Sequence, residues 1–155
     1  MVRWIIIAGL VLIFDQISKI GISNTMEVFE TIQLVPCFQL TYVHNPGAAF
    51  SFLSDAGGWQ RWFFIGLSSA VSAVLCVWLL RLPSDASWQS AGLALVLGGA
   101  LGNLLDRVLY GYVIDFLDVY YKTWHWPAFN IADSAITIGV CILLLDSFRH
   151  EDNTV

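Results

Sequence analysis

Four long apolar segments alternate with shorter polar connections along the chain. They run over about residues 4–22, 62–80, 88–105 and 129–146, and each is near the length that an α-helix needs to cross a bilayer. An even number of spans puts both termini on one side of the membrane. The two longer connections, about residues 23–61 and 106–128, share the other side, and Pro83 interrupts the short middle one. The pattern predicts a four-helix membrane bundle, with residues 1–155 forming a single domain.

The two longer connections carry patterns of their own. Residues 38–42 (FQLTY) alternate apolar and polar side chains with the period of a strand, and residues 44–47 (HNPG) are a turn signal. We therefore expect a small β-sheet on the membrane surface, with residues 38–50 forming a mobile cover over a site. In the second connection, the aromatic run over residues 120–127 has the composition of an interfacial belt.

Composition agrees with membrane insertion and argues against other classes. Of 155 residues, 57% are hydrophobic and only 12% are charged, about half the charged fraction of a soluble domain. The net charge of −5, without a basic tract, argues against a nucleic-acid partner. The three cysteines lack the spacing of a disulfide framework or a metal site. His44 and His125 each stand alone, so we expect neither a metal nor a cofactor.

The orientation of the bundle depends on how the basic residues are counted. Setting Lys19 and Arg107 aside as partners of buried acids leaves three basic residues on the terminal side, plus the amino terminus, against two on the other. This balance favours termini in the cytoplasm. The basic residues counted are Arg3, Arg81 and Arg149 on the terminal side, and Arg61 and Lys122 on the other.

Asp115 and Asp133 are the candidate catalytic residues. Each lies among apolar residues at the edge of a long hydrophobic segment, where an ionised group is costly and is usually paired, protonated or used in chemistry. Two carboxyls on the same side of one bundle suit a reaction in which one activates water and the other donates a proton. A structural alternative exists for Asp133, because Asn130 can cap the last helix with Asp133 at its third position.

Charged and small residues inside the spans also have structural explanations. Asp15 and Lys19 are one helical turn apart in the first span, so they can form a structural ion pair. The small residues Gly98, Gly99 and Gly102 let another helix approach closely, either within the bundle or in a groove for a foreign helix.

The end of the third span carries a further polar group of residues. Asp106 and Arg107 can form an interfacial charge pair, with Arg107 extending to water. Asn103 and Arg107 are spaced i, i+4, so both can face one site, and the amide of Asn103 can hold an extended backbone.

Five short motifs occur in order along the chain. They are residues 15–19 (DQISK), 45–50 (NPGAAF), 98–107 (GGALGNLLDR), 113–116 (VIDF) and 129–133 (FNIAD). Any one of them is weak evidence, but together, within a short four-span chain, they strongly resemble lipoprotein signal peptidase, the bacterial signal peptidase II family. The resemblance covers nearly the whole chain.

The resemblance implies a fold and an activity. The fold is that of an all-α membrane protein with four transmembrane helices, a small periplasmic β-sheet and a surface loop segment. The activity is that of an aspartic endopeptidase of the bacterial inner membrane, acting near the periplasmic face without a metal. Its substrate would be a diacylglyceryl-modified prolipoprotein, cleaved on the amino side of the lipidated cysteine. Membrane lipid and globomycin-type inhibitors would be its other partners.

The same resemblance assigns roles to individual residues. Asp115 and Asp133 would form the catalytic dyad. The residues expected to bind substrate or support the site are Asp15, Lys19, Asn45, Gly47, Gly102, Asn103, Asp106, Arg107 and Asn130.

Two other classes of function would use the acids differently. A small ion- or proton-coupled transporter would need a relay of charged residues through the bundle, formed here by Asp15, Lys19, Asp106 and Asp133. Against it, residues 63–80 and 92–101 carry no ionisable group other than Cys76, and no inverted repeat is visible. A purely structural membrane subunit would leave the clustered acids unexplained.

Overall fold

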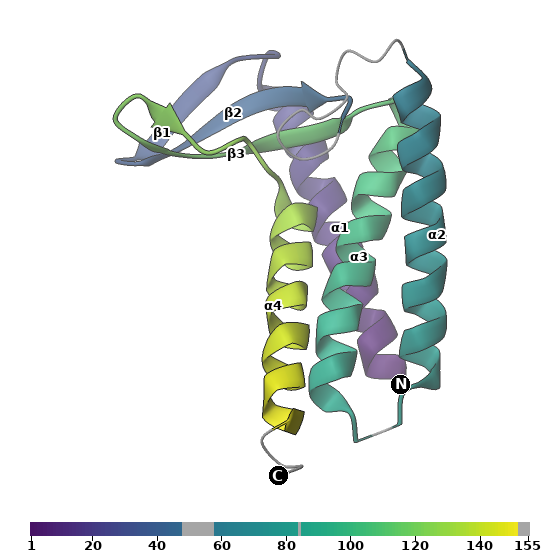
Figure 1. Ribbon diagram of the computed structural model, residues 1–155. Helices are drawn as coiled ribbons and strands as arrows, with labels where there is room; N and C mark the ends of the chain where they lie inside the picture. The colour runs from purple at the N-terminus through teal and green to yellow at the C-terminus, as the bar shows by residue number, and fades with distance from the viewer. Residues whose placement is uncertain (48–57, 84, 152–155) are drawn as a thin grey trace.

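The computed structural model describes residues 1–47, 58–83 and 85–151, and four α-helices dominate this part of the chain. All four are long and apolar enough to cross a membrane, which confirms the predicted bundle. Their ends differ by a few residues from the apolar runs, because helical structure continues into the polar flanks. The helices, which lie side by side in Figure 1, are α1 (Val2–Thr25), α2 (Trp59–Arg81), α3 (Ser87–Leu109) and α4 (Ile131–Glu151).

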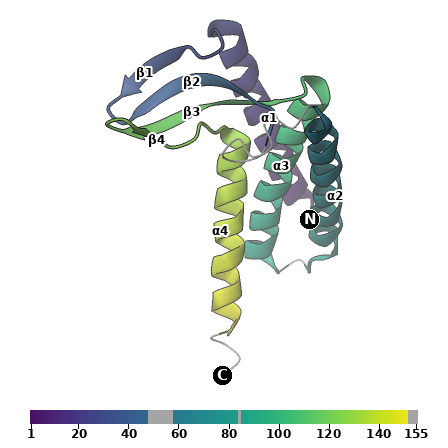
Figure 2. The same ribbon diagram turned by 45° about the horizontal axis from the view of Figure 1, so that its top comes forward.

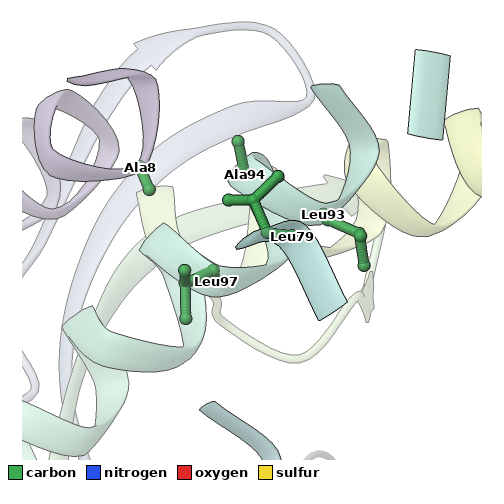
Figure 3. Packing of buried hydrophobic residues seen from close by; sticks show 5 residues of the cluster. All are labelled: Ala8, Leu79, Leu93, Ala94 and Leu97. Carbon is green, nitrogen blue, oxygen red and sulfur yellow. The ribbon is translucent and has the colours of Figure 1, made fainter. Parts of the chain in front are cut away.

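Helix α3 is the centre of the bundle and packs against the other three helices. In the most hydrophobic 18-residue stretch of α3, 56% of the residues are buried. The corresponding values are 17% in α1, 17% in α2 and 22% in α4. Buried apolar side chains from α1, α2 and α3 meet in one cluster (Figure 3), and the large apolar side chains on the outer faces remain exposed, as expected for surfaces in contact with lipid. The cluster consists of Ala8, Leu79, Leu93, Ala94 and Leu97.

The glycines of α3 allow this close packing. A Cβ atom on Gly98 would lie 2.6 Å from the carbonyl oxygen of Ala8 in α1, and one on Gly99 would collide with the carbonyl oxygen of Ala132 in α4. A Cβ on Gly102 would lie 2.5 Å from Oδ2 of Asp15. The space beside these glycines is therefore occupied by the chain's own atoms, so the glycines serve packing within the bundle.

A four-stranded antiparallel sheet crosses the end of the bundle opposite to the amino terminus and to the end of α4 (Figures 1 and 2). The predicted sheet is confirmed, and the alternating segment at residues 38–42 forms part of strand β2. The predicted cover at residues 38–50 is described only to residue 47, and its remainder lies outside the described residues. The strands, in spatial order, are β1 (Thr31–Val35), β2 (Phe38–Asn45), β3 (Val113–Tyr121) and β4 (Trp124–His125).

Strand β3 belongs to the second long connection and brings Asp115 into the sheet. The chain leaves α3 through Gly111, whose φ of 87° favours a residue without a side chain. Asp115 then pairs with Val43 of β2. The chain returns along β3, where the backbone amide and carbonyl of Leu117 bond those of Phe129. This return places the start of α4 directly beside Asp115.

Candidate active site

Asp115 is a buried carboxyl held by two asparagine amides. Its side chain lies on β3 with a relative exposure of 3%. Oδ1 accepts a hydrogen bond from Nδ2 of Asn130 at 2.7 Å, and Oδ2 accepts one from Nδ2 of Asn45 at 2.9 Å. Burial, followed by the negative charge of Asp133, raises the pKa of Asp115 to about 7, while the two amide donors act in the opposite direction. Near neutral pH this carboxyl can therefore hold a proton.

Asp133 lies in the first turn of α4 and is only partly buried. Its Oδ1 accepts a hydrogen bond from Nδ2 of Asn103 at 2.7 Å. Its Oδ2 accepts one from the backbone amide of Asn130 at 3.3 Å, and Oδ1 of Asn130 accepts one from the backbone amide of Asp133 at 2.9 Å. The last two bonds form a capping box, so the structural interpretation of Asp133 holds. The same cap fixes the position of the carboxylate beside Asp115.

Asn130 connects the two candidate catalytic residues. Its side chain is fully buried, and its Nδ2 donates to Asp115 and lies 3.1 Å from Oδ1 of Asn103. Its backbone amide and its Oδ1 make the two capping bonds with Asp133. A single residue therefore orients both carboxyls.

A buried charge cluster lies beneath these asparagines. The ion pair predicted between Asp15 and Lys19 is confirmed, with Nζ 2.7 Å from Oδ2 of Asp15. Nζ is also 2.9 Å from Oδ2 of Asp106 and 3.0 Å from Oδ1 of Asn103. Gln16 was not identified as a site residue, although its Nε2 donates to Oδ1 of Asp106 at 2.8 Å. The sequence feature that could have identified Gln16 is its position beside Asp15, where a polar amide stands inside an apolar span.

Arg107 does not form the predicted interfacial pair with Asp106, because Asp106 turns inward to Lys19. Arg107 is itself buried, with a relative exposure of 9%, so it does not extend to water. Nη1 donates to the carbonyl oxygen of Asn103 at 3.2 Å and Nη2 to that of Gly47 at 3.0 Å. The backbone amide of Gly47 in turn donates to Oδ1 of Asn45. Arg107 thus links the third span to the segment that follows β2.

The structure brings the predicted site residues together in one place. Asn45, Asn103 and Asn130 contact the candidate catalytic carboxyls directly. Gly102 packs against Asp15, which belongs to the charge cluster. The residues connected by hydrogen bonds or ion pairs are Asp15, Lys19, Asn45, Gly47, Asn103, Asp106, Arg107, Asp115, Asn130 and Asp133.

An apolar cavity of about 550 Å³ opens beside Asp133 on the outer side of α4. Asp133 and Ser134 line one end, and Ile138, whose relative exposure is 55%, lies on a lipid-facing surface. The remaining lining residues are Trp126, Pro127, Ala128, Phe129, Ile136 and Thr137. The lining is therefore mostly apolar, and its polar side chains include Asp133, Ser134 and Thr137.

His44 and His125 lie in the sheet and contact other partners. His44 stacks on Tyr112 at 3.8 Å between ring centroids, and burial lowers its pKa. Nδ1 of His125 lies 3.0 Å from Oδ2 of Asp118, a buried carboxyl three residues beyond Asp115. Among the described residues, no group of three or more His, Cys, Asp or Glu side chains could hold a metal ion.

A family model described as Signal peptidase (SPase) II matches residues 7–149 of the chain. The lipoprotein signal peptidase of Alteromonas mediterranea is 52% identical over 150 residues, which are 97% of this chain and 82% of the relative. That of Shewanella piezotolerans is 55% identical over 147 residues, 94% of this chain and 86% of the relative. That of Vibrio cholerae is 48% identical over 149 residues, 95% and 87% respectively.

Two solved structures resemble the whole architecture. A bacterial membrane enzyme determined by the in meso method at 2.3 Å resolution superposes with a TM-score of 0.90 at 32% identity, covering 100% of this chain and 93% of that one. A second, determined by the same method at 1.9 Å, gives a TM-score of 0.82 at 33% identity, covering 94% and 92%.

Proposed function

The chain belongs to the signal peptidase II family, and on that premise we propose that Asp115 and Asp133 are its catalytic pair. It is a membrane-embedded protease of the aspartic class that removes signal peptides from prolipoproteins. The observation that carries the assignment of the pair is their shared partner, since Asn130 hydrogen-bonds both carboxyls.

The surroundings of the two carboxyls give them different roles. Asp115 is buried and its raised pKa of about 7 suits the carboxyl that holds a proton. Asp133 borders the cavity and lies at a helix N-terminus, where backbone amides and the helix dipole stabilise negative charge. Asp133 is thus the base that accepts a proton from water, and Asp115 is the acid that hydrogen-bonds the scissile carbonyl.

The reaction then proceeds in two steps. The water oxygen bonds to the carbonyl carbon while one of its protons passes to Asp133, and the proton of Asp115 stabilises the carbonyl oxygen. The tetrahedral intermediate collapses when the proton on Asp133 passes to the nitrogen and the carbon–nitrogen bond breaks. Asp115 keeps its proton throughout, and its hydrogen bond to the oxygen is released as the new carboxyl forms. The bond cleaved is the one on the amino side of the lipidated cysteine.

The cavity beside Asp133 supports the proposal that the enzyme distinguishes a lipid-modified cysteine from an unmodified one. An acyl chain of a diacylglyceryl group can enter from the bilayer along Ile138, and the peptide then lies at the end occupied by Asp133. An inhibitor of the globomycin type, which is a cyclic peptide, would compete for the same end. The substrate is therefore a prolipoprotein whose cysteine already carries lipid.

We expect the purified protein to cleave diacylglyceryl-modified prolipoprotein much faster than prolipoprotein without the lipid.

Ile138→Trp should fill part of the cavity and raise the KM for the modified substrate on the order of tenfold, the cost of displacing roughly two buried methylene groups. The kcat at saturation should not change. Steady-state cleavage assays of both substrates measure the two effects.

Leu145→Trp is the matched control for this experiment. Leu145 has a relative exposure of 57%, close to the 55% of Ile138, and lies seven residues further along α4. It does not line the cavity. Equal cleavage of modified and unmodified substrate, or equal KM changes in the two tryptophan variants, would contradict the assignment of the cavity.

We propose that the protein lies in the bacterial inner membrane with its sheet on the periplasmic side. The amino terminus and the end of α4, which lie at the opposite end of the bundle, are then on the cytoplasmic side. The burial of Lys19 and Arg107 supports leaving them out of the charge count, which then favours this orientation. In intact cells, a membrane-impermeant thiol reagent should label the exposed Cys37 beside β1. It should not label a Cys37→Ser, Asp85→Cys variant. The reverse labelling pattern would place the site on the cytoplasmic side.

A further inference from the structure

The residue before each proposed catalytic aspartate donates its backbone amide to a carboxylate of a neighbouring helix. The amide of Ile114, which precedes Asp115, donates to Oδ2 of Asp106 at 3.1 Å. The amide of Ala132, which precedes Asp133, donates to Oδ1 of Asp15 at 2.9 Å. Strand β3 and helix α4 are therefore each held, one residue before the catalytic side chain, by a carboxylate from another element.

Both of these carboxylates contact the ammonium group of Lys19, at 2.7 Å for Asp15 and 2.9 Å for Asp106. All three side chains are at most 1% exposed. The third contact of the ammonium, at 3.0 Å, is with Oδ1 of Asn103. This contact directs Nδ2 of Asn103 to Asp133. The three protons of the ammonium group are thus used in holding the site together.

The charge balance argues for more than neutralisation. Asp15 alone would neutralise Lys19, and the addition of Asp106 gives these three side chains a formal excess of one carboxylate. A second buried carboxylate is costly unless its oxygens are satisfied. Both oxygens of Asp106 are satisfied, one by the amide of Ile114 and the other by Nε2 of Gln16. The hydrogen bond between Asp106 and the Ile114 amide fixes the position of β3, and we take this to be the role of the second carboxylate.

We propose that Lys19 is a positioning residue that sets the separation of Asp115 and Asp133 by holding Asp106 and Asp15, which anchor β3 and α4. This inference rests on the proposed catalytic pair. It assigns Asp106 the role of holding Asp115 in register with Asp133, at a distance that admits one water between them.

Asp106→Ala and Asp106→Asn test the proposal in the full-length protein. The alanine variant removes the anchor of the Ile114 amide and should lower kcat about ten- to a hundredfold per folded molecule, the effect typical of losing an outer-shell support. The KM should stay within about twofold. Asparagine keeps an oxygen for the Ile114 amide but weakens the contact with Lys19, so its kcat should fall several-fold and lie between those of alanine and wild type.

Asp118→Ala is the control, since Asp118 is also a buried carboxyl of β3 but contacts Gln39, Thr41 and His125 instead. It should lower the melting temperature without lowering kcat per folded molecule. A wild-type kcat in Asp106→Asn, or an increase in KM alone, would overturn the positioning role, even if Asp106→Ala does not fold.

Asp115→Asn is assayed in parallel, to separate failure of the positioning role from failure of the catalytic pair. If it is inactive while the Asp106 variants match wild type, only the positioning role fails; if it is active, the catalytic pair itself fails.

Discussion

Replacing Asp115 or Asp133 by asparagine is expected to lower the rate of signal-peptide cleavage by about 10²- to 10⁴-fold, the contribution of a positioned acid or base. Asparagine has nearly the same shape as aspartate, so the fold and substrate binding should survive better than turnover. In the Asp133→Asn variant the new amide oxygen could still accept the capping bond, but the side chain could not take a proton from water. Single-turnover cleavage of a lipid-modified substrate, with binding measured separately, gives both quantities.

Asp118→Asn is the matched control, because it removes a carboxyl from the same strand three residues away. Asp118 is buried and accepts hydrogen bonds from Gln39 and Thr41, so the comparison must be made per folded molecule. The control should keep its turnover. Near-normal cleavage by a folded Asp115→Asn or Asp133→Asn variant would remove the aspartic mechanism from consideration. A complete loss of wild-type activity in a metal chelator would do the same.

The helices could be predicted from sequence because the bilayer fixes the length and polarity of a span. Strand β2 could be predicted for a related reason, since its segment alternates apolar and polar side chains with the period of a strand. Strand β3 lacks this signal, because the residues from Val113 to Phe116 are all buried and show no alternation. The pairing of β2 with β3 joins residues more than 60 positions apart in the sequence, and local pattern carries no information about such pairing.

The residues of the site were identified by their motifs, but their contacts required the structure. Asp15 and Lys19 lie on one helix, so their ion pair follows from a spacing of one turn. The contact between Lys19 and Asp106 depends on how α1 packs on α3, which the sequence does not specify. Arg107 was assigned to the interface because long basic side chains usually reach water. Here the carbonyls of Asn103 and Gly47 bind its guanidinium inside the protein.

The different roles that we propose for Asp115 and Asp133 rest on their different burial. Asp115 lies under the sheet at 3% exposure, whereas Asp133 borders the cavity. Burial and the negative charge of Asp133 both raise the pKa of Asp115, so in the proposed mechanism Asp115 is the carboxyl that holds the proton. This arrangement requires no side chain other than the two carboxyls to move a proton.

The pH dependence of kcat should have an alkaline limb controlled by Asp115. Its pKa is raised to about 7, so its proton is lost as the pH rises through that value. The mechanism needs this carboxyl protonated, and kcat should therefore fall about tenfold for each pH unit well above 7.

Asn45→Ala should move this alkaline limb of the kcat profile to higher pH. The amide of Asn45 donates to Oδ2 of Asp115 at 2.9 Å and stabilises the ionised form, so removing it raises the pKa further and the proton is retained longer. Cleavage rates at saturating substrate between pH 5 and pH 9 measure the shift, and Asn24→Ala, which changes an exposed asparagine near the end of α1, should leave the limb in place. A limb that stays fixed or moves to lower pH in Asn45→Ala would show that the proton lost at high pH does not belong to Asp115.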